Sequence, residues 1–209
     1  MPYFKNRKIN MLFIHIPKTG GSSLEKYFSV KYNIPLNLKS LISTENIICF
    51  ADKPEITSSL QHLSYNTIIK YKDFFKIDTN NINIITIVRN PYNKVMSDLF
   101  YLKKINMDTT KEEVYNKIKE YLKEKHDNHV VPQYTFITDE NEKLIENIKI
   151  LHTETLNCDM INLGYKDFNI RMNMNPNNVN YDDYLNKDSI NLINEIYNKD
   201  FEILNYKKK

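Results

Sequence analysis

The stretch that most constrains the fold is an apolar run that passes through a proline and two glycines into a helix-like pattern, residues 13–25 (FIHIPKTGGSSLE). The chain has only three glycines, and two of them, Gly20 and Gly21, are adjacent here. Glycine is favoured where the backbone must approach a ligand closely or adopt an unusual conformation. The pattern predicts a strand over 11–16, a tight loop, and a helix from residue 19 or 22 to about 32.

This strand, loop and helix start are suited to binding an oxyanion. The unpaired N–H groups and the positive dipole end of the helix would point into the loop, where Lys18 adds a mobile positive charge. The hydroxyl groups of Thr19, Ser22 and Ser23 are further donors, and the two serines stand where an N-cap and first turn are expected. A Walker A loop has its lysine after the glycines, whereas here nothing basic follows them until Lys26, so a nucleotide triphosphatase is disfavoured. An ordinary turn rich in small residues is the alternative.

Length and charge limit the possible classes of protein. With 209 residues the chain is long enough for one well-packed domain and short for two, so we expect a single domain over residues 1–209. A formal net charge of +3 suits an anionic ligand but is too small to indicate nucleic acid as a partner. No run of about eighteen apolar residues occurs, which predicts no membrane span. The apolar run at 11–14 is too short for a signal-peptide core, so we expect a cytoplasmic location.

The two cysteines give little sign of chemistry. Cys49 and Cys158 lie far apart, each has apolar neighbours, and their spacing fits no metal-binding motif. They are predicted to be buried thiols in a reducing compartment, and we expect no metal site.

The rest of the chain alternates strand-like and helix-like segments. Residues 1–10 read as a polar lead-in to the first strand. Strands are predicted over 47–50, 82–88 and 148–151, and helices over 67–75, 91–102, 110–125, 155–163 and from Asp188, as its cap, to about 201. This alternation predicts an α/β fold, a three-layer sandwich with a mostly parallel central sheet flanked by helices.

A second candidate site residue follows the β-branched run at 82–88. Arg89 stands at the carboxyl end of that strand, where open α/β sheets bind ligands, and Ser97 lies about two turns into the next helix. Arginine presents a planar fork of donors to a phosphate, and the two side chains can approach one anion from two sides. The alternative is a structural arginine paired with Asp98 or Glu154.

Together, residues 13–24 (FIHIPKTGGSSL) and 87–97 (IVRNPYNKVMS) resemble the sulfotransferases that use 3'-phosphoadenosine 5'-phosphosulfate (PAPS), in particular the carbohydrate and heparan sulfate 2-O-sulfotransferase branch. Weaker likeness continues at 131–133, 151–156 and 196–206. The resemblance implies a P-loop-like form of the sandwich, PAPS as sulfuryl donor and a carbohydrate hydroxyl as acceptor. Residue types alone do not distinguish a sugar from a tyrosine, a lipid or a small alcohol.

The resemblance also implies roles for individual residues. Lys18 would contact the bridging and sulfuryl oxygens, residues 19–23 would hold the 5'-phosphate, and Arg89 and Ser97 would hold the 3'-phosphate. The donor-binding set is Pro17, Lys18, Thr19, Gly20, Gly21, Ser22, Ser23, Arg89 and Ser97.

The acceptor hydroxyl needs a base, and the free pKa of histidine suits that task. We favour His62, which lies between the two motifs where related carbohydrate sulfotransferases carry a histidine base; a hydrogen-bonded core histidine is the alternative. The other histidines are His15, which is expected to be structural, His126 and His129, which could instead line an acceptor site, and His152. If the base is a carboxylate, the candidates are Glu25, Asp52 and Glu55.

Two other functions compete with sulfuryl transfer. A non-catalytic module that binds PAPS or its product is one, and intact Lys18 and His62 argue against it. A P-loop-like kinase is the other, and both the order of the loop residues and the lack of an evident magnesium-binding carboxylate after a strand oppose it.

Overall fold

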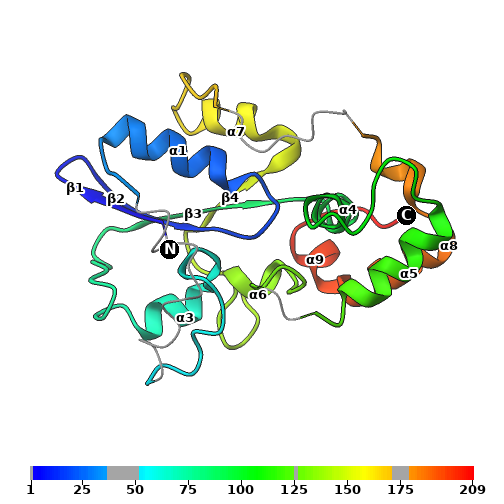
Figure 1. The fold of residues 1–209 in the computed structure, drawn as a ribbon. Helices are drawn as coiled ribbons and strands as arrows, with labels where there is room; N and C mark the ends of the chain where they lie inside the picture. Colours follow the sequence, from blue (N-terminus) through cyan, green and yellow to red (C-terminus); the bar gives the residue numbers. More distant parts are fainter. Residues whose placement is uncertain (1, 37–51, 125–126, 171–178) are drawn as a thin grey trace.

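A computed structural model describes residues 2–36, 52–124, 127–170 and 179–209. Its centre is a four-stranded sheet in the order β1 (Tyr3–Asn6), β2 (Ile9–Ile14), β3 (Asn83–Val88) and β4 (Lys149–His152). Strands β2, β3 and β4 run parallel, and β1 pairs antiparallel with β2. The expected α/β fold with a mostly parallel sheet is confirmed (Figure 1).

Helices cover both faces of the sheet. Helices α1 (Gly21–Tyr32) and α7 (Leu156–Asn162) lie on one face, and α3 (Tyr65–Lys70) and α6 (Tyr134–Ile137) lie on the other (Figure 1). Successive strand residues point to opposite faces, so Leu12 and Ile14 pack into the cluster with α3 and α6, whereas Phe13 packs with α1 and α7. Both faces of β2 and β3 are therefore buried, as their continuous apolar runs predict.

The first ten residues are not only a polar lead-in. Residues 3–6 form β1, and the completely buried Phe4 packs its ring 5.7 Å from that of Phe28 on α1. The Asn6 side chain accepts hydrogen bonds from the N–H groups of Lys8 and Ile9, which shapes the turn into β2. The hairpin of β1 and β2 depends on one buried aromatic side chain and one asparagine turn. The sequence pattern that could have predicted it is therefore weak.

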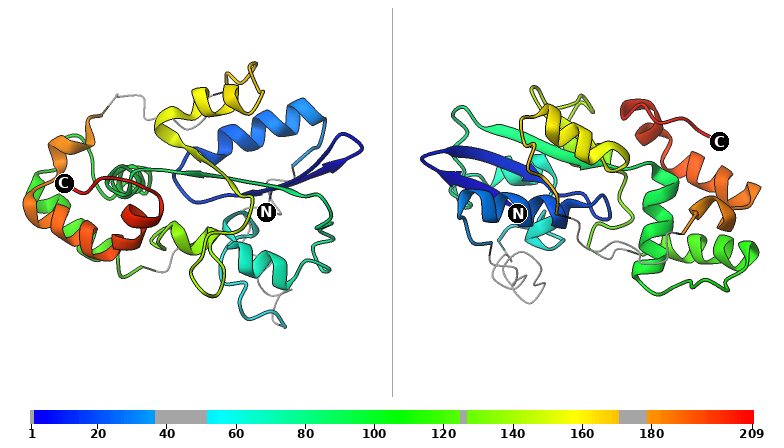
Figure 2. Two further views of the ribbon diagram at one scale, coloured as in Figure 1. Left: turned by 180° about the vertical axis from the view of Figure 1, so that it is seen from behind. Right: turned by 90° about the horizontal axis from the view of Figure 1, so that it is seen from above.

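A second group of helices packs beyond the carboxyl end of β3. It consists of α4 (Pro91–Tyr101), α5 (Lys111–Tyr121), α8 (Lys187–Ile196) and α9 (Asn198–Ile203) (Figure 2). These four helices share an apolar cluster of their own. The expected single last helix is wrong, because it breaks at Tyr197 into α8 and α9. Its N-cap is Asn186 rather than Asp188, since the Asn186 side chain accepts from the Ser189 N–H at 2.8 Å.

Two further expectations concern the cysteines and the strand at 47–50. Cys158 is exposed on α7, so its predicted burial is wrong; Met160 on the same helix is the buried residue. Cys49 and the strand predicted at 47–50 lie outside the described residues. Within the described part of the chain, no helix is long and apolar enough to cross a membrane.

Candidate active site

The loop between β2 and α1 has a backbone path that few residue types adopt easily. Lys18 has a φ of 65° and Gly20 a φ of 93°, both in the left-handed region. Gly20 is the N-cap of α1, so the expectation of a serine cap at Ser22 or Ser23 is wrong. Because its N-cap is a glycine, α1 receives no hydrogen bond from an N-cap side chain. Its first N–H groups are therefore arranged as in helix termini that bind anions.

The hydroxyl groups of the loop do not all face the same way. Thr19 is buried, and its hydroxyl donates to the Ile16 carbonyl at 2.9 Å, which closes the loop. The Thr153 hydroxyl lies 2.6 Å from the Thr19 carbonyl and 3.0 Å from the Val88 carbonyl, which links the loop to the end of β3. Ser22 stays half-buried. The Thr19 side chain therefore shapes the loop, and only its backbone remains for a ligand.

Gly21 is required because His15 packs against its backbone. A Cβ atom built on Gly21 would lie 2.4 Å from the His15 ring, which is closer than Cβ atoms approach other atoms in real proteins. The His15 ring has little freedom to move away, since its Nδ1 lies 2.5 Å from the Glu25 carboxylate. The second glycine of the motif thus provides space for an imidazole rather than a special backbone conformation.

Replacing Gly21 with alanine should destabilise the protein by about 1–3 kcal/mol, the usual cost of overpacking a filled core. Alanine is a better helix former than glycine, so without the clash the same change in α1 would stabilise the protein. Urea unfolding of the two proteins measures the difference. An unchanged or increased free energy of unfolding in Gly21→Ala would contradict the contact with His15.

The structure brings Arg89 to the loop. Its Nη1 donates to the Lys18 carbonyl at 3.0 Å, so the two motifs meet although 71 residues separate them. No described carboxylate lies within ion-pair distance of Arg89. Of the two expected alternatives, Asp98 pairs with His129, and Glu154 accepts from the Asn90 N–H at 2.9 Å. The interpretation of Arg89 as a structural ion-pair residue is therefore not supported.

The backbone of Arg89 is held by a single buried side chain. Gln133 accepts from the Arg89 N–H at 2.8 Å and donates to the Arg89 carbonyl at 2.7 Å. The buried Asp200 accepts in turn from the backbone N–H of Gln133 at 2.9 Å. The Asn90 side chain caps α4 by accepting from the Tyr92 N–H at 3.0 Å. On this helix Ser97 is half-buried, and within the described residues no hydrogen bond joins it to Arg89 or to the loop.

The Lys18 side chain extends from the loop to α4. Its Nζ is 3.5 Å from the centre of the Tyr101 ring, a cation–π contact. Burial lowers the pKa of Lys18 to about 8; the positive charge of Arg89 also lowers it, and Asp98 opposes both. Lys18 is therefore protonated at neutral pH and loses its proton in mildly alkaline solution.

His62 is held by a carboxylate. It lies on the short 3₁₀ helix η2 (Leu60–His62), with its Nδ1 2.7 Å from Asp127. Asp127 is fixed by the Ser59 N–H at 2.6 Å and the Ser59 hydroxyl at 3.0 Å. Burial lowers the pKa of His62, and the hydrogen bond to Asp127 opposes that effect. Although burial raises the pKa of Asp127, its bonds to His62 and Ser59 prevail and lower it to about 2. This carboxylate is ionised at neutral pH.

Two more histidine–carboxylate pairs flank His62. The His15 ring meets the edge of the His62 ring at 5.1 Å between centroids, and the His129 ring lies 5.4 Å away. His15 pairs with Glu25, and His129 Nδ1 lies 2.8 Å from Asp98. We call these three imidazoles the histidine row. His62, Asp127 and His129 each offer one atom that could bind a metal ion, and these atoms lie within 4.8 Å of one another. The Nδ1 atoms of both histidines, however, already face carboxylates.

The other candidate bases lie elsewhere or are engaged. Asp52 pairs with Lys53, and Glu55 with Lys70 and Tyr71; both carboxylates are exposed. His152 lies at the end of β4, 3.8 Å from Asp159 and outside the histidine row. His126 lies outside the described residues.

Several site residues were not predicted. Tyr101 and Asp127 enter the site through contacts between segments far apart in the chain, and Asp98, which was considered only as a partner of Arg89, instead holds His129. Asp98 and Tyr101 do follow Ser97 on α4 at spacings of one and four. A helical projection from Ser97 would have found Tyr101 on the same face.

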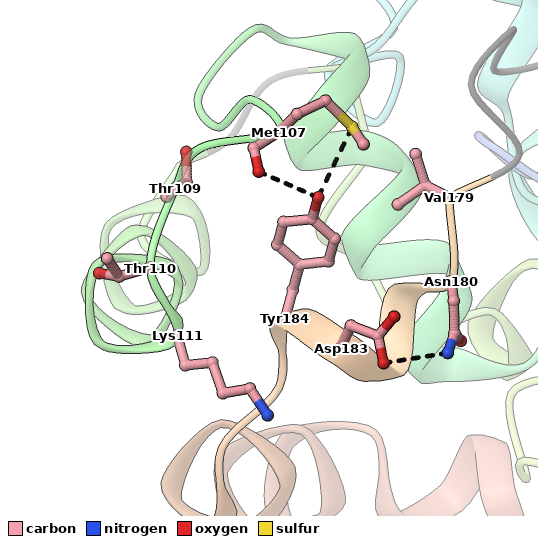
Figure 3. A pocket seen from close by; sticks show the side chains of 8 residues that line it. All are labelled: Met107, Thr109, Thr110, Lys111, Val179, Asn180, Asp183 and Tyr184. Carbon is pink, nitrogen blue, oxygen red and sulfur yellow. Dashed lines mark hydrogen bonds between the residues drawn. The ribbon is translucent and has the colours of Figure 1, made fainter.

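An open pocket of about 500 Å³ lies apart from these residues. It is formed by the segment between α4 and α5 and by the 3₁₀ helix η4 (Tyr181–Tyr184), and Tyr184 donates to the Met107 carbonyl across it (Figure 3). No residue of the expected donor-binding set lines it. The Tyr181 ring at the start of η4 lies 5.6 Å from the Arg89 guanidinium carbon, so this helix borders the site.

Comparison with known proteins gives one finding. A sequence model described as the sulfotransferase family matches residues 1–207. Neither the curated proteins nor the solved structures gave a match. The matched range includes the loop, Arg89 and the histidine row.

Proposed function

Since the chain belongs to the sulfotransferase family, we propose that it transfers the sulfuryl group of PAPS to a hydroxyl group of a carbohydrate. The observation that carries this proposal is the hydrogen bond from Arg89 Nη1 to the Lys18 carbonyl at 3.0 Å. This bond places the proposed anion-binding loop beside Arg89, the proposed second phosphate-binding residue. A nucleotide with phosphate groups at both ends of its ribose needs two phosphate-binding parts of the protein close to each other.

We propose that the loop binds the donor's 5'-phosphosulfate. The N–H groups at the start of α1 and the Ser22 hydroxyl face the phosphate, and Lys18 lies at the sulfuryl end. Arg89 and Ser97 bind the 3'-phosphate, Arg89 through its planar donor fork. The cation–π contact with Tyr101 holds the Lys18 ammonium beside the loop.

In the proposed reaction the acceptor oxygen attacks sulfur in line with the bridging oxygen. A new S–O bond forms, and the bond from sulfur to the bridging oxygen breaks with its electron pair leaving on adenosine 3',5'-bisphosphate. Lys18 neutralises charge that develops on the bridging oxygen, and the binding groups fix the geometry. No metal ion takes part in this step.

His62 is proposed to accept the proton of the acceptor hydroxyl. Its Nδ1 faces the ionised Asp127, so the Nδ1–H tautomer is favoured and Nε2 carries the lone pair. No described residue forms a hydrogen bond with Nε2. Burial lowers the pKa of His62, which keeps the imidazole neutral and able to act as a base at neutral pH.

The carbohydrate acceptor rests on the resemblance of the two motifs to carbohydrate sulfotransferases. Transfer of labelled sulfate from PAPS to a panel of glycans, tyrosine peptides, lipids and small alcohols tests it. Labelling confined to glycans supports the proposal. Labelling of another class instead would overturn the carbohydrate assignment and identify that class as the acceptor. Nucleotide binding without transfer to any member of the panel would instead indicate a non-catalytic binding module.

Replacing Arg89 with alanine should weaken binding of adenosine 3',5'-bisphosphate by about tenfold to a hundredfold, the range for charged hydrogen bonds. Binding of adenosine 5'-phosphate should hardly change, because that nucleotide has no 3'-phosphate. Calorimetry with both nucleotides measures the difference. Arg7→Ala, in the exposed turn between β1 and β2, is the matched control. An equal loss of affinity for both nucleotides, or tighter binding of ATP by the unchanged chain, would contradict the assignment.

A further inference from the structure

Glu25 is a buried carboxylate whose oxygens are fully engaged. Gln61 Nε2 lies 3.0 Å and 2.9 Å from its two oxygens, and His15 Nδ1 lies 2.5 Å from one of them. The Gln61 amide is also 3.0 Å from His15 Nδ1. These three side chains, which we call the Glu25 cluster, come from α1, from η2 and from the residue that follows β2. A carboxylate held in this way is poorly placed to serve as the base.

The Glu25 cluster touches both the donor loop and the base. On the loop side, the His15 ring fills the space that a side chain on Gly21 would need. On the other side, Gln61 is the neighbour of His62 in η2, and the His15 ring contacts the His62 ring at 5.1 Å. Gln61, His15 and Glu25 are all less than one-tenth exposed. The cluster is thus a buried link between the two parts of the site that must act together.

We propose that Glu25 is a positioning residue which, through Gln61 and His15, fixes the His62 imidazole relative to the donor-binding loop. Its effect on transfer rests on the proposed function. In-line transfer requires the base and the donor to keep a fixed separation, and small displacements of a reacting group cost large factors in rate. The first helix after the loop thereby sets the position of a side chain that is distant in sequence.

The charges around His62 give this link a measurable signature. His62 faces His15 and Glu25 on the loop side, Asp127 and His129 on the other, and Asp98 behind His129. Burial is the largest cause of the lowered pKa of His62; the neighbouring His15 also lowers it, and Glu25 raises it by less. Replacing His15 with a side chain that cannot ionise should therefore raise the pKa of His62.

The first test needs no acceptor. An asparagine amide overlies Nδ1 of histidine, so His15→Asn keeps a donor for Glu25 and removes the charge. NMR titration of the His62 ring proton, assigned with His62→Ala, should show a higher midpoint in His15→Asn. The exposed Glu112→Gln is the control and should leave the midpoint unchanged. An unchanged midpoint in His15→Asn overturns the proposed link.

The second test measures transfer. Glu25→Gln should lower kcat about tenfold to a hundredfold with unchanged affinity for adenosine 3',5'-bisphosphate. In the His62→Ala background the same change should alter the residual rate less than twofold, because Glu25 acts through His62. Equal losses of rate in both backgrounds overturn the proposal. If Glu25→Gln does not fold, Gln61→Met replaces it in the same pair of measurements.

If the unchanged chain sulfates no acceptor, the proposed function fails, while the titration still tests the link between the Glu25 cluster and His62.

Discussion

Replacing His62 with alanine is expected to lower kcat for sulfuryl transfer by about a hundredfold to ten-thousandfold, the usual contribution of a general base. The affinity for adenosine 3',5'-bisphosphate should stay the same, because His62 lies outside both of the proposed phosphate-binding groups. Transfer of labelled sulfate and calorimetry on the same protein preparations measure the two effects. Full turnover by His62→Ala would rule out the base role.

Asp127 provides the matched test of how His62 is held. Asp127→Asn keeps the size of the side chain but removes the charge that orients the imidazole at 2.7 Å. Its loss of rate should be smaller than that of His62→Ala, and the double variant should be no slower than His62→Ala alone. Additive losses would show that Asp127 acts elsewhere.

Replacing Lys18 with methionine should lower kcat by about a hundredfold to a thousandfold, as loss of a group that stabilises developing charge does. The pKa of Lys18 is lowered to about 8, so its proton is present below that pH and lost as the pH rises through it. In the unchanged protein, kcat/KM should therefore fall above about pH 8. Steady-state rates over a pH series measure both effects.

Two variants make the test of Lys18 specific. Lys26→Met removes an exposed lysine from the same helix region and should leave the rates unchanged. Lys18→Arg keeps a charge at all accessible pH values, so any activity it retains should lack the alkaline decline. A decline that persists in Lys18→Arg would assign it to another group.

The local patterns of the chain predicted most of the elements that carry the site. The loop at residues 17–23, the strand before Arg89 and the amphipathic helix after it each have a signal within a few residues. The fold class followed from their alternation. The strand β1 and the break at Tyr197 were missed, because each depends on packing against distant parts of the chain rather than on periodicity.

The electrostatic surroundings of the site were less predictable. His62 was proposed from a resemblance, but its partner Asp127 lies 65 residues away and no spacing rule connects them. Glu25 was a candidate base, whereas the structure surrounds it with His15 and Gln61. A sequence shows which residues can ionise; their partners depend on how the segments pack.

The segment from Asp127 to Gln133 has an unusual restriction on its length. At one end, Asp127 orients His62. At the other end, the Gln133 side chain bonds to the N–H and the carbonyl of Arg89, and the Gln133 N–H donates to Asp200. Between them, the His129 carbonyl accepts from the buried Lys94 at 2.5 Å. Surface connections usually tolerate insertions, but an extra residue here would move one anchor out of reach of the other. Related chains should therefore vary in the side chains of this segment more readily than in its number of residues.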